Sequence, residues 1–157
     1  MPRDSSGDAQ RHARGSAFPE TGDTDTNLPG RKTRASRLRN AAAVARAASE
    51  AAGENGTITI VCAGRAENPG GFSIDDLYTA GVLVQRLEAL GGNALTEWAQ
   101  AARLLAIAEP DPLAVLWYSA AGRAVIRLGL EGDVVYAAVQ DVSEVVPRLG
   151  MQLHLTG

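Results

Sequence analysis

The sequence contains few cysteine, histidine and aromatic residues, and each shortage excludes a kind of site. Among 157 residues there are one cysteine and two histidines, and aromatic residues make up 4%. The single thiol, Cys62, can form neither an internal disulfide nor a four-cysteine zinc site, which fits a reducing, cytoplasmic setting. With so few aromatic side chains, the core must be built from Ala, Val, Leu and Ile. The length is that of one domain.

Positive charge and long apolar runs are lacking as well. The formal net charge is −3, which does not favour nucleic-acid binding by the molecule as a whole. No apolar run approaches the ~20 residues of a membrane span, and the first residues lack the apolar stretch of a secretory signal. The sequence also has no Walker A or G-x-G-x-x-G motif. We therefore expect no membrane partner and no nucleotide site.

Residues 1–37 differ in composition from the rest and predict a disordered arm. They are rich in Arg, Asp, Ser, Thr, Gly and Pro, and after Met1 their only large apolar residues are Phe18 and Leu28. Such a segment cannot bury enough apolar surface to offset its chain entropy. Residues 38–157 form the predicted domain.

A basic cluster at residues 31–39 spans the end of this arm. Its sequence is Arg-Lys-Thr-Arg-Ala-Ser-Arg-Leu-Arg. Such a cluster is either a solvated run of charge or a contact surface for RNA, DNA or another anion. No aromatic residue is interleaved with it, so base stacking has no support. Nucleic-acid binding through Arg31–Arg39 is therefore the least favoured function.

The pattern of residues 57–62, Thr-Ile-Thr-Ile-Val-Cys, predicts a central buried strand, because it is apolar enough on both faces. Periodicity and glycine or proline breaks predict the other elements. These are helices at 41–48, 73–90 and 95–108, one or two short helices within 113–128 hinged at Gly122, a strand or two-turn helix at 133–140, and short strands at 145–149 and 151–155. Together they predict an α/β fold, with helices layered on a mostly parallel or mixed sheet.

The predicted unit of strand, glycine-containing loop and helix ends on two carboxylates, Asp75 and Asp76. Ligands of open α/β sheets bind beyond the carboxyl ends of the strands. Ser73 and Asp76 have the spacing of a capping box, and both acids lie where a helix dipole favours negative charge. The alternative is that one carboxylate caps the helix while its neighbour holds a divalent cation such as Mg²⁺.

Other residues also have two interpretations. Asn40 is either the N-cap of the first helix or a donor to a phosphate. Gly64 begins a loop that lets backbone amides approach an anion, which is a weak signal alone. Cys62 is better explained as a small apolar filler than as a nucleophile. Asp133 and Asp141 are helix caps or spare acids for a metal cleft.

Taken together, several short motifs resemble the 2-phosphosulfolactate phosphatase family over about residues 38–157. The matching pieces are Asn40-Ala41-Ala42-Ala43-Val44-Ala45, Val61-Cys62-Ala63-Gly64, Phe72-Ser73-Ile74-Asp75-Asp76 with Ala80-Gly81, Gly129 with Asp133-Val134 and Asp141, and Val145-Val146-Pro147. The resemblance implies a Mg²⁺-dependent α/β phosphatase that converts 2-phosphosulfolactate into 3-sulfolactate and phosphate, on a route to coenzyme M.

The resemblance also implies roles for particular residues. Asp76 and Asp75 become the catalytic residues, with Asp76 as the Mg²⁺ ligand, and Asn40 and Gly64 help to bind the phosphate of a small phosphorylated organic acid. The family's Asp-Val-Leu-Arg-Ala-Thr-like and Thr-Asn-Gly-Thr-like segments are not present in this sequence. The predicted fold is therefore incomplete relative to the family. The alternative function is a non-catalytic remnant or interaction module, for which we expect self-association.

Overall fold

The computed structural model describes residues 32–64, 71–91 and 94–148, and within these ranges the chain is helical. A short 3-10 helix, η1 (Leu38–Asn40), precedes six α-helices. Their bounds are α1 Ala41–Ala52, α2 Ile74–Glu88, α3 Glu97–Ala108, α4 Pro112–Tyr118, α5 Ala120–Ile126 and α6 Glu131–Ala138. The predicted helices at 41–48, 73–90 and 95–108 are thereby confirmed as α1, α2 and α3.

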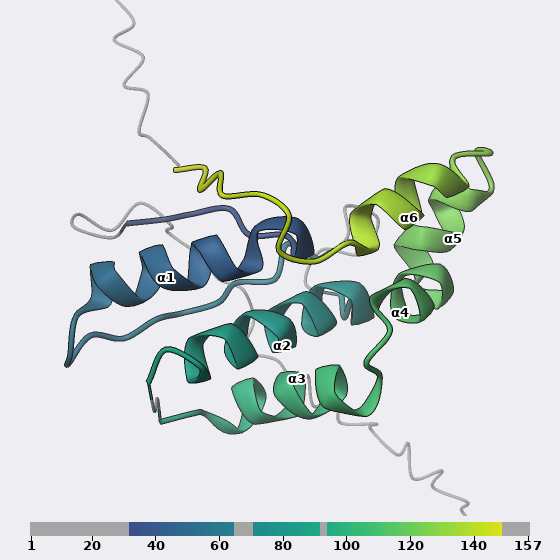
Figure 1. Ribbon diagram of the computed structural model, residues 1–157. Helices are drawn as coiled ribbons and strands as arrows, with labels where there is room; N and C mark the ends of the chain where they lie inside the picture. The colour runs from purple at the N-terminus through teal and green to yellow at the C-terminus, as the bar shows by residue number, and fades with distance from the viewer. Residues whose placement is uncertain (1–31, 65–70, 92–93, 149–157) are drawn as a thin grey trace, which may run out of the picture.

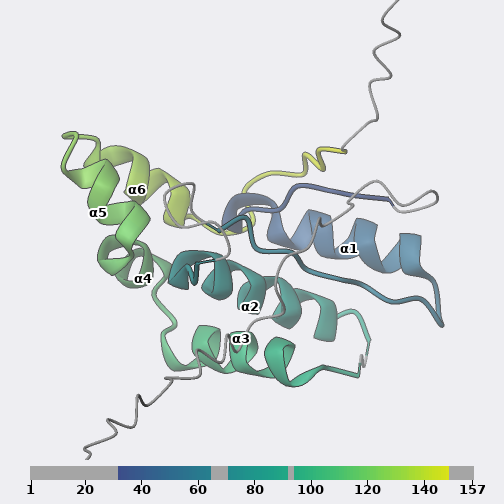
Figure 2. The same ribbon diagram turned by 180° about the vertical axis from the view of Figure 1, so that it is seen from behind.

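The predicted α/β fold is wrong for the described residues. They contain no strand and no sheet, only an isolated antiparallel bridge between Arg34 and Arg148. Residues 57–63 run beside α1 and α2 as an extended segment that has no strand partner among the described residues (Figures 1 and 2). Extended backbone becomes a strand only when a neighbour accepts its hydrogen bonds, and apolar composition alone does not supply one. The predicted strand at 151–155 lies outside the described residues.

The predicted strand is also buried on one face rather than two. Ile58 and Ile60 are half-buried and pack against the α1–α2 cluster that contains Val44 and Leu83. Thr57 and Thr59, which alternate with them along the chain, are exposed. This alternation is that of a segment lying on a surface with one side free.

Helix α2 is the centre of the molecule, with α1 on one side and α3 on the other (Figure 1). Tyr78 and Val82 of α2 belong to one core cluster, which also includes Leu38 of η1 and Ala106 of α3. Helix α3 approaches closely because α2 has a glycine at position 81. A Cβ atom on Gly81 would lie 2.0 Å from the carbonyl oxygen of Ala102.

Helices α4, α5 and α6 form a second group at one end of α2 (Figures 1 and 2). The region 113–128 is broken at Ser119 rather than at the predicted hinge, Gly122. The buried Ser119 hydroxyl accepts a hydrogen bond from the Gly122 amide at 2.8 Å and donates to the Leu116 carbonyl at 2.9 Å. A serine N-cap therefore starts α5. The ambiguous segment 133–140 is mostly helical, since α6 extends to Ala138.

Most of the predicted arm, residues 1–31, lies outside the described residues. Residues 32–37 run extended past α1, and the amide of Ala35 donates to the carbonyl of Pro147 at 3.1 Å. None of the helices within the described ranges has the length and hydropathy needed to cross a membrane. The cytoplasmic setting stays a prediction.

Candidate functional site

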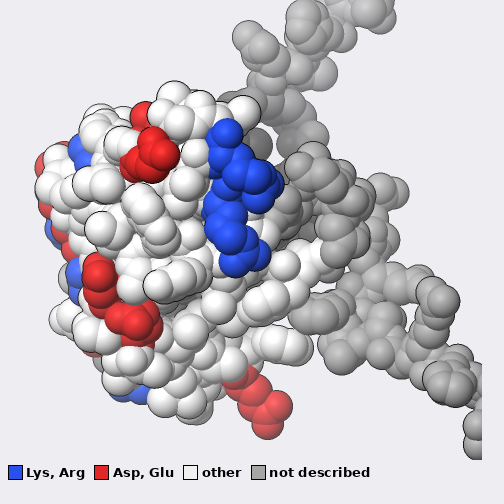
Figure 3. Space-filling model, turned by 90° about the vertical axis from the view of Figure 1, so that its right-hand side faces the viewer, with Lys and Arg blue, Asp and Glu red and all other residues white. Residues whose placement is uncertain are grey.

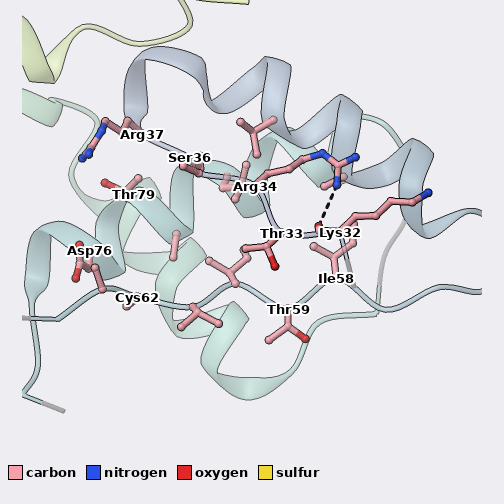
Figure 4. A pocket seen from close by; sticks show the side chains of 18 of the residues that line it. Lys32, Thr33, Arg34, Ser36, Arg37, Ile58, Thr59, Cys62, Asp76 and Thr79 are labelled. Carbon is pink, nitrogen blue, oxygen red and sulfur yellow. Dashed lines mark hydrogen bonds between the residues drawn. The ribbon is translucent and has the colours of Figure 1, made fainter. Parts of the chain in front are cut away.

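Two cavities meet at the start of α2, and four residues line both of them. The larger, about 840 Å³, lies between the extended segments 32–37 and 57–63. The smaller, about 470 Å³, lies between η1, the start of α2 and helices α4–α6. The shared residues are Ser36, Arg37, Asp76 and Thr79. We call these four residues the junction, and Figure 4 shows Arg37, Asp76 and Thr79 at one end of the larger cavity.

Asp76 is held at the junction by the backbone of the loop that precedes α2. Its Oδ2 atom accepts a hydrogen bond of 2.7 Å from the amide of Gly64, which has the left-handed φ of 71° that glycine tolerates. Asp76 is half-buried, and its Oδ1 atom makes no hydrogen bond within the described ranges. One carboxylate oxygen thus fixes the side chain while the other remains available to a ligand.

The predicted capping box is not formed. Ser73 is the N-cap of α2, but its side chain accepts no capping hydrogen bond. The Ser73 hydroxyl instead donates to Asp75 Oδ1 at 2.8 Å, and Thr79 Oγ1 donates to the Asp75 carbonyl at 2.8 Å. Asp75 lines the smaller cavity only. The reason is that the loop amide at Gly64 competes for Asp76 and draws it away from the end of its own helix.

Two arginines, Arg37 and Arg39, also line these cavities. Arg39 lies over the ring of Tyr136, 3.6 Å from its centroid, and donates to the Tyr136 carbonyl at 2.9 Å. The guanidinium of Arg37 makes no hydrogen bond with another described residue, and Arg37 lines both cavities. On the side of the molecule seen in Figure 3, Lys and Arg side chains gather in one strip. The junction thus combines a free cation with a carboxylate and two hydroxyl groups.

The other predicted phosphate ligands lie elsewhere. Asn40 is buried, and its amide nitrogen donates to the carbonyls of Val145 at 2.9 Å and Ala35 at 3.4 Å. Its Oδ1 atom accepts from the Arg37 amide at 2.7 Å, so Asn40 joins three segments and lines neither cavity. The Gly64 amide is occupied by Asp76.

Cys62 is exposed, so it does not fill the core as predicted. Desolvation of the thiol raises its pKa, and the nearby carboxylates of Asp76 and Asp75 raise the pKa further. A nucleophilic cysteine needs the opposite shift, because the thiolate is the reactive form. The raised pKa argues against a catalytic thiol at the junction, and it places Cys62 within the electrostatic reach of Asp76.

The two spare acids are separated in the structure. Asp133 is exposed in the first turn of α6 and lines the smaller cavity. Asp141 acts at the start of α1, where its Oδ1 atom accepts from the Ala42 amide at 2.7 Å, and its Oδ2 atom pairs with Arg86 Nε at 2.7 Å. Asp141 is thus a cap of a helix far from it in sequence.

A metal ion would depend on few protein ligands. The described residues include no group of three or more His, Cys, Asp or Glu side chains that could hold a metal ion. Mg²⁺ commonly binds through one or two carboxylates, with water and substrate phosphate completing its coordination. Asp76, with one uncommitted oxygen, fits that limited role.

Sequence reasoning identified Asp76 but missed Ser36, Arg37 and Thr79 as its neighbours. Arg37 was included in the basic cluster, which indicated anion binding without indicating which arginine lines a cavity. Ser36 and Thr79 carry no sequence signal, because a hydroxyl residue is common in any extended segment or helix.

The comparisons with known proteins match a family model and three proteins that carry the same description. A family model described as 2-phosphosulpholactate phosphatase matches residues 29–152. The chain is 44% identical over 112 residues to a protein of Thermus thermophilus named "Probable 2-phosphosulfolactate phosphatase", and 41% identical over 112 residues to one of the same name from Deinococcus radiodurans. A third protein of that name, from Gloeobacter violaceus, is 39% identical over 79 residues. The first two matches cover 71% of this chain and 45% of each relative.

Proposed function

The chain belongs to the 2-phosphosulfolactate phosphatase family, and on that premise we propose that the junction binds and dephosphorylates a small phosphorylated organic acid. The observation that carries the proposal is the meeting of Arg37, Asp76 and two hydroxyl groups at the place where both cavities join. The relatives' shared name makes 2-phosphosulfolactate the first substrate to test. Because the chain spans about 45% of the length of two of these relatives, the activity of the whole family protein is part of the proposal.

We assign phosphate binding to the arginine side chains. A guanidinium presents paired N–H donors that match two phosphate oxygens. Arg37 has this group unoccupied, whereas Arg39 is held against Tyr136. We assign the phosphate to Arg37 and leave Arg39 to add positive potential from the neighbouring wall. The Thr79 hydroxyl donates its only proton to the Asp75 carbonyl, so it helps to position this wall and does not bind the phosphate.

Hydrolysis needs a water molecule and a base. A water oxygen attacks phosphorus while the bond from phosphorus to the ester oxygen breaks. The Asp75 carboxylate takes a proton from that water, because the free oxygen of Asp76 is assigned to the cation, and the leaving alcohol oxygen takes a proton from solvent. The products are 3-sulfolactate, for the substrate named above, and inorganic phosphate. A place for this product on a route to coenzyme M, which the family resemblance implies, belongs to the same proposal.

Mg²⁺ is the proposed cofactor, and Asp76 is the residue that would hold it. When bound, Mg²⁺ supplies charge that neutralises the phosphoryl oxygens in the transition state. Asp75 is kept near by its bond to Ser73, and it contributes negative charge that attracts the cation. A small phosphorylated acid, rather than a nucleic acid, is the proposed partner of the basic residues.

The test is release of phosphate from 2-phosphosulfolactate by the purified chain, with and without Mg²⁺. The Thermus thermophilus relative serves as the reference enzyme. We expect release that Asp76→Asn reduces about 100-fold or more through loss of the Mg²⁺ ligand. We expect Arg37→Ala to raise KM about tenfold or more through loss of charge-assisted hydrogen bonds to the phosphate.

The matched control is Arg46→Ala. Arg46 is an exposed arginine of α1 paired with Glu144 and lines neither cavity, so its loss should leave phosphate release unchanged. If the Thermus relative releases phosphate from 2-phosphosulfolactate and this chain does not, the proposal is wrong. An equal loss in Arg37→Ala and Arg46→Ala would show that arginine content, rather than the junction, matters.

A further inference from the structure

The larger cavity is a groove whose walls are two extended backbones. Residues 32–37 form one wall and residues 57–63 the other, and they lie side by side in Figure 4. The floor between them is apolar and comes from α1 and α2, with Val44, Ala48, Ala80 and Leu83 among the lining residues. A groove of this form is shaped for an elongated apolar occupant.

The wall at 32–37 uses its backbone hydrogen-bonding groups along one side and leaves them open along the other. Its bridge to Arg148 uses the amide of Ala35, which donates to Pro147. In an extended chain the backbone groups of successive residues point to opposite sides. The N–H groups of Arg34 and Ser36 therefore point away from residues 145–148, toward the groove, and neither donates a hydrogen bond to a described residue.

Two side-chain atoms on the same wall also lack partners. Arg34 Nε and Ser36 Oγ are buried and make no hydrogen bond with any residue that the structure describes. Buried polar atoms in folded proteins almost always have partners, since an unsatisfied group costs about 1–3 kcal/mol. Both residues line the groove. Their orphaned atoms are a second observation, independent of the backbone, that something polar is missing at this wall.

The wall at 57–63 is open as well. No backbone group of these residues makes a hydrogen bond with any part of the chain that the structure describes. Its half-buried side chains, Ile58 and Ile60, already face the α1–α2 core. The segment is thus placed as the outer member of a strand pair whose partner is absent.

We propose that the groove binds an extended segment of polypeptide by strand addition, with backbone hydrogen bonds to both walls. The occupant comes from the part of the family sequence that this chain does not cover. The match of 112 residues accounts for 45% of the Thermus relative, so more than half of that protein's sequence lies outside the matched region. Strand addition needs only exposed backbone and alternating apolar side chains, which both walls and the floor accommodate. This inference goes beyond the phosphatase proposal and stands without it.

The test uses two polypeptides, this full chain and the part of the Thermus relative outside its matched 112 residues. Binding is followed by titration, and amide hydrogen exchange is measured for residues 57–63. We expect a complex of one copy of each, in which exchange at 57–63 slows about tenfold or more relative to the chain alone. An unrelated polypeptide of equal length should give neither effect.

The matched variants are Arg34→Pro and Arg34→Ala. Both remove the side chain, but only proline removes the N–H that points into the groove. We expect proline to weaken binding about three- to tenfold relative to alanine, the loss of one hydrogen bond. The exchange measurement on the unaltered chain keeps the proposal testable if the proline variant does not fold.

Two outcomes overturn the proposal. One is a complex in which exchange at residues 57–63 stays fast, which would place the partner elsewhere. The other is slow exchange at 57–63 in a homodimer of this chain alone, which would make a second copy the occupant. Neither measurement uses substrate, so failure here is distinct from failure of the phosphatase proposal.

Discussion

At the scale of single residues, Asp76 is positioned by a loop rather than by its own helix. The Gly64 amide holds Oδ2 at 2.7 Å, and Cys62, two residues before Gly64, feels the charge of the carboxylate. The raised pKa of the Cys62 thiol therefore reports on Asp76 without any need for substrate. This makes the exposed thiol a probe of the junction.

Asp76→Asn should make Cys62 easier to alkylate. The Cys62 pKa is raised first by desolvation and then by Asp76, so removing the Asp76 charge lowers the pKa and increases the thiolate fraction at pH 8. We expect iodoacetamide to react a few-fold faster with the variant. In the parent chain, the alkylation rate should keep increasing with pH until above pH 9. Desolvation remains, so the variant should not reach the rate of a free cysteine.

The control for this measurement is Asp133→Asn. Asp133 lines the smaller cavity but is not among the causes of the Cys62 shift. Its loss should leave the alkylation rate as it is. Equal rates in Asp76→Asn and the parent chain would contradict the placement of Asp76 beside the thiol. Addition of Mg²⁺ to the parent chain should speed alkylation if the ion binds at Asp76, because the cation opposes the carboxylate charge.

At the scale of elements, the contact between α2 and α3 depends on a missing side chain. Gly81 is buried, and a Cβ atom there would come within 2.0 Å of the Ala102 carbonyl oxygen and 3.0 Å of the Ala106 Cβ atom. Helix α2 carries the junction residues Asp76 and Thr79, so the α2–α3 spacing also sets the position of the site. Gly81 is also one of the residues on which the family resemblance rests, and close helix packing explains why glycine occupies this position.

Gly81→Ala should therefore destabilise the protein, although alanine is the better helix former. Helix propensity favours alanine by about 1 kcal/mol, but backbone overlap forces the helices apart at a cost of typically 1–3 kcal/mol or more. We expect a net loss in free energy of unfolding of about 1–2 kcal/mol, measured by urea denaturation. The comparison is Gly132→Ala in α6, where a Cβ atom meets nothing within 4 Å and the expected change is a gain of about 0.4–1 kcal/mol. Equal effects at the two glycines would be inconsistent with a close α2–α3 approach.

At the scale of the whole molecule, Asp141 connects the first and last described helices to the centre. It follows α6, caps the start of α1 through the Ala42 amide, and pairs with Arg86 of α2. Its backbone φ of 52° is left-handed, a conformation that Asp and Asn tolerate better than other non-glycine residues. Asp141 thus suits its position in two ways: its side chain caps α1 and pairs with Arg86, and its residue type tolerates the left-handed backbone.

Asp141→Ala should cost more stability than Asp141→Asn. Alanine removes the cap, worth about 0.5–2 kcal/mol, removes the pairing with Arg86, and is strained at this φ. Asparagine keeps a carbonyl oxygen for Ala42 and tolerates the conformation, so it loses mainly the partly buried ion pair. We expect a loss of about 2–3 kcal/mol for alanine and about 1 kcal/mol for asparagine, measured by urea denaturation. A larger loss for asparagine would mean that charge, rather than geometry, is what Asp141 supplies.

Local patterns predicted the helices well, because their signals are contained in short stretches of sequence. The alanine-rich run became α1, and the apolar stripe after Ser73 became α2. The break at Ser119 was misplaced at Gly122, because serine caps and glycine breaks look alike without knowing which hydroxyl reaches an amide. The capping box at Ser73 failed for a related reason, since the competing donor, Gly64, lies across a loop.

The sequence by itself determined the helices, the family and the acid at the start of α2. These follow from residue order and from periodicity within one segment. Only the tertiary structure decided that residues 57–62 have no strand partner in the described part of the chain. It also decided that the Asn40 amide bonds Val145 and Ala35, and that Arg37 lines both cavities. The physical reason is that strand pairing and hydrogen-bond satisfaction depend on distant segments, whereas helix formation depends on neighbours three and four residues away.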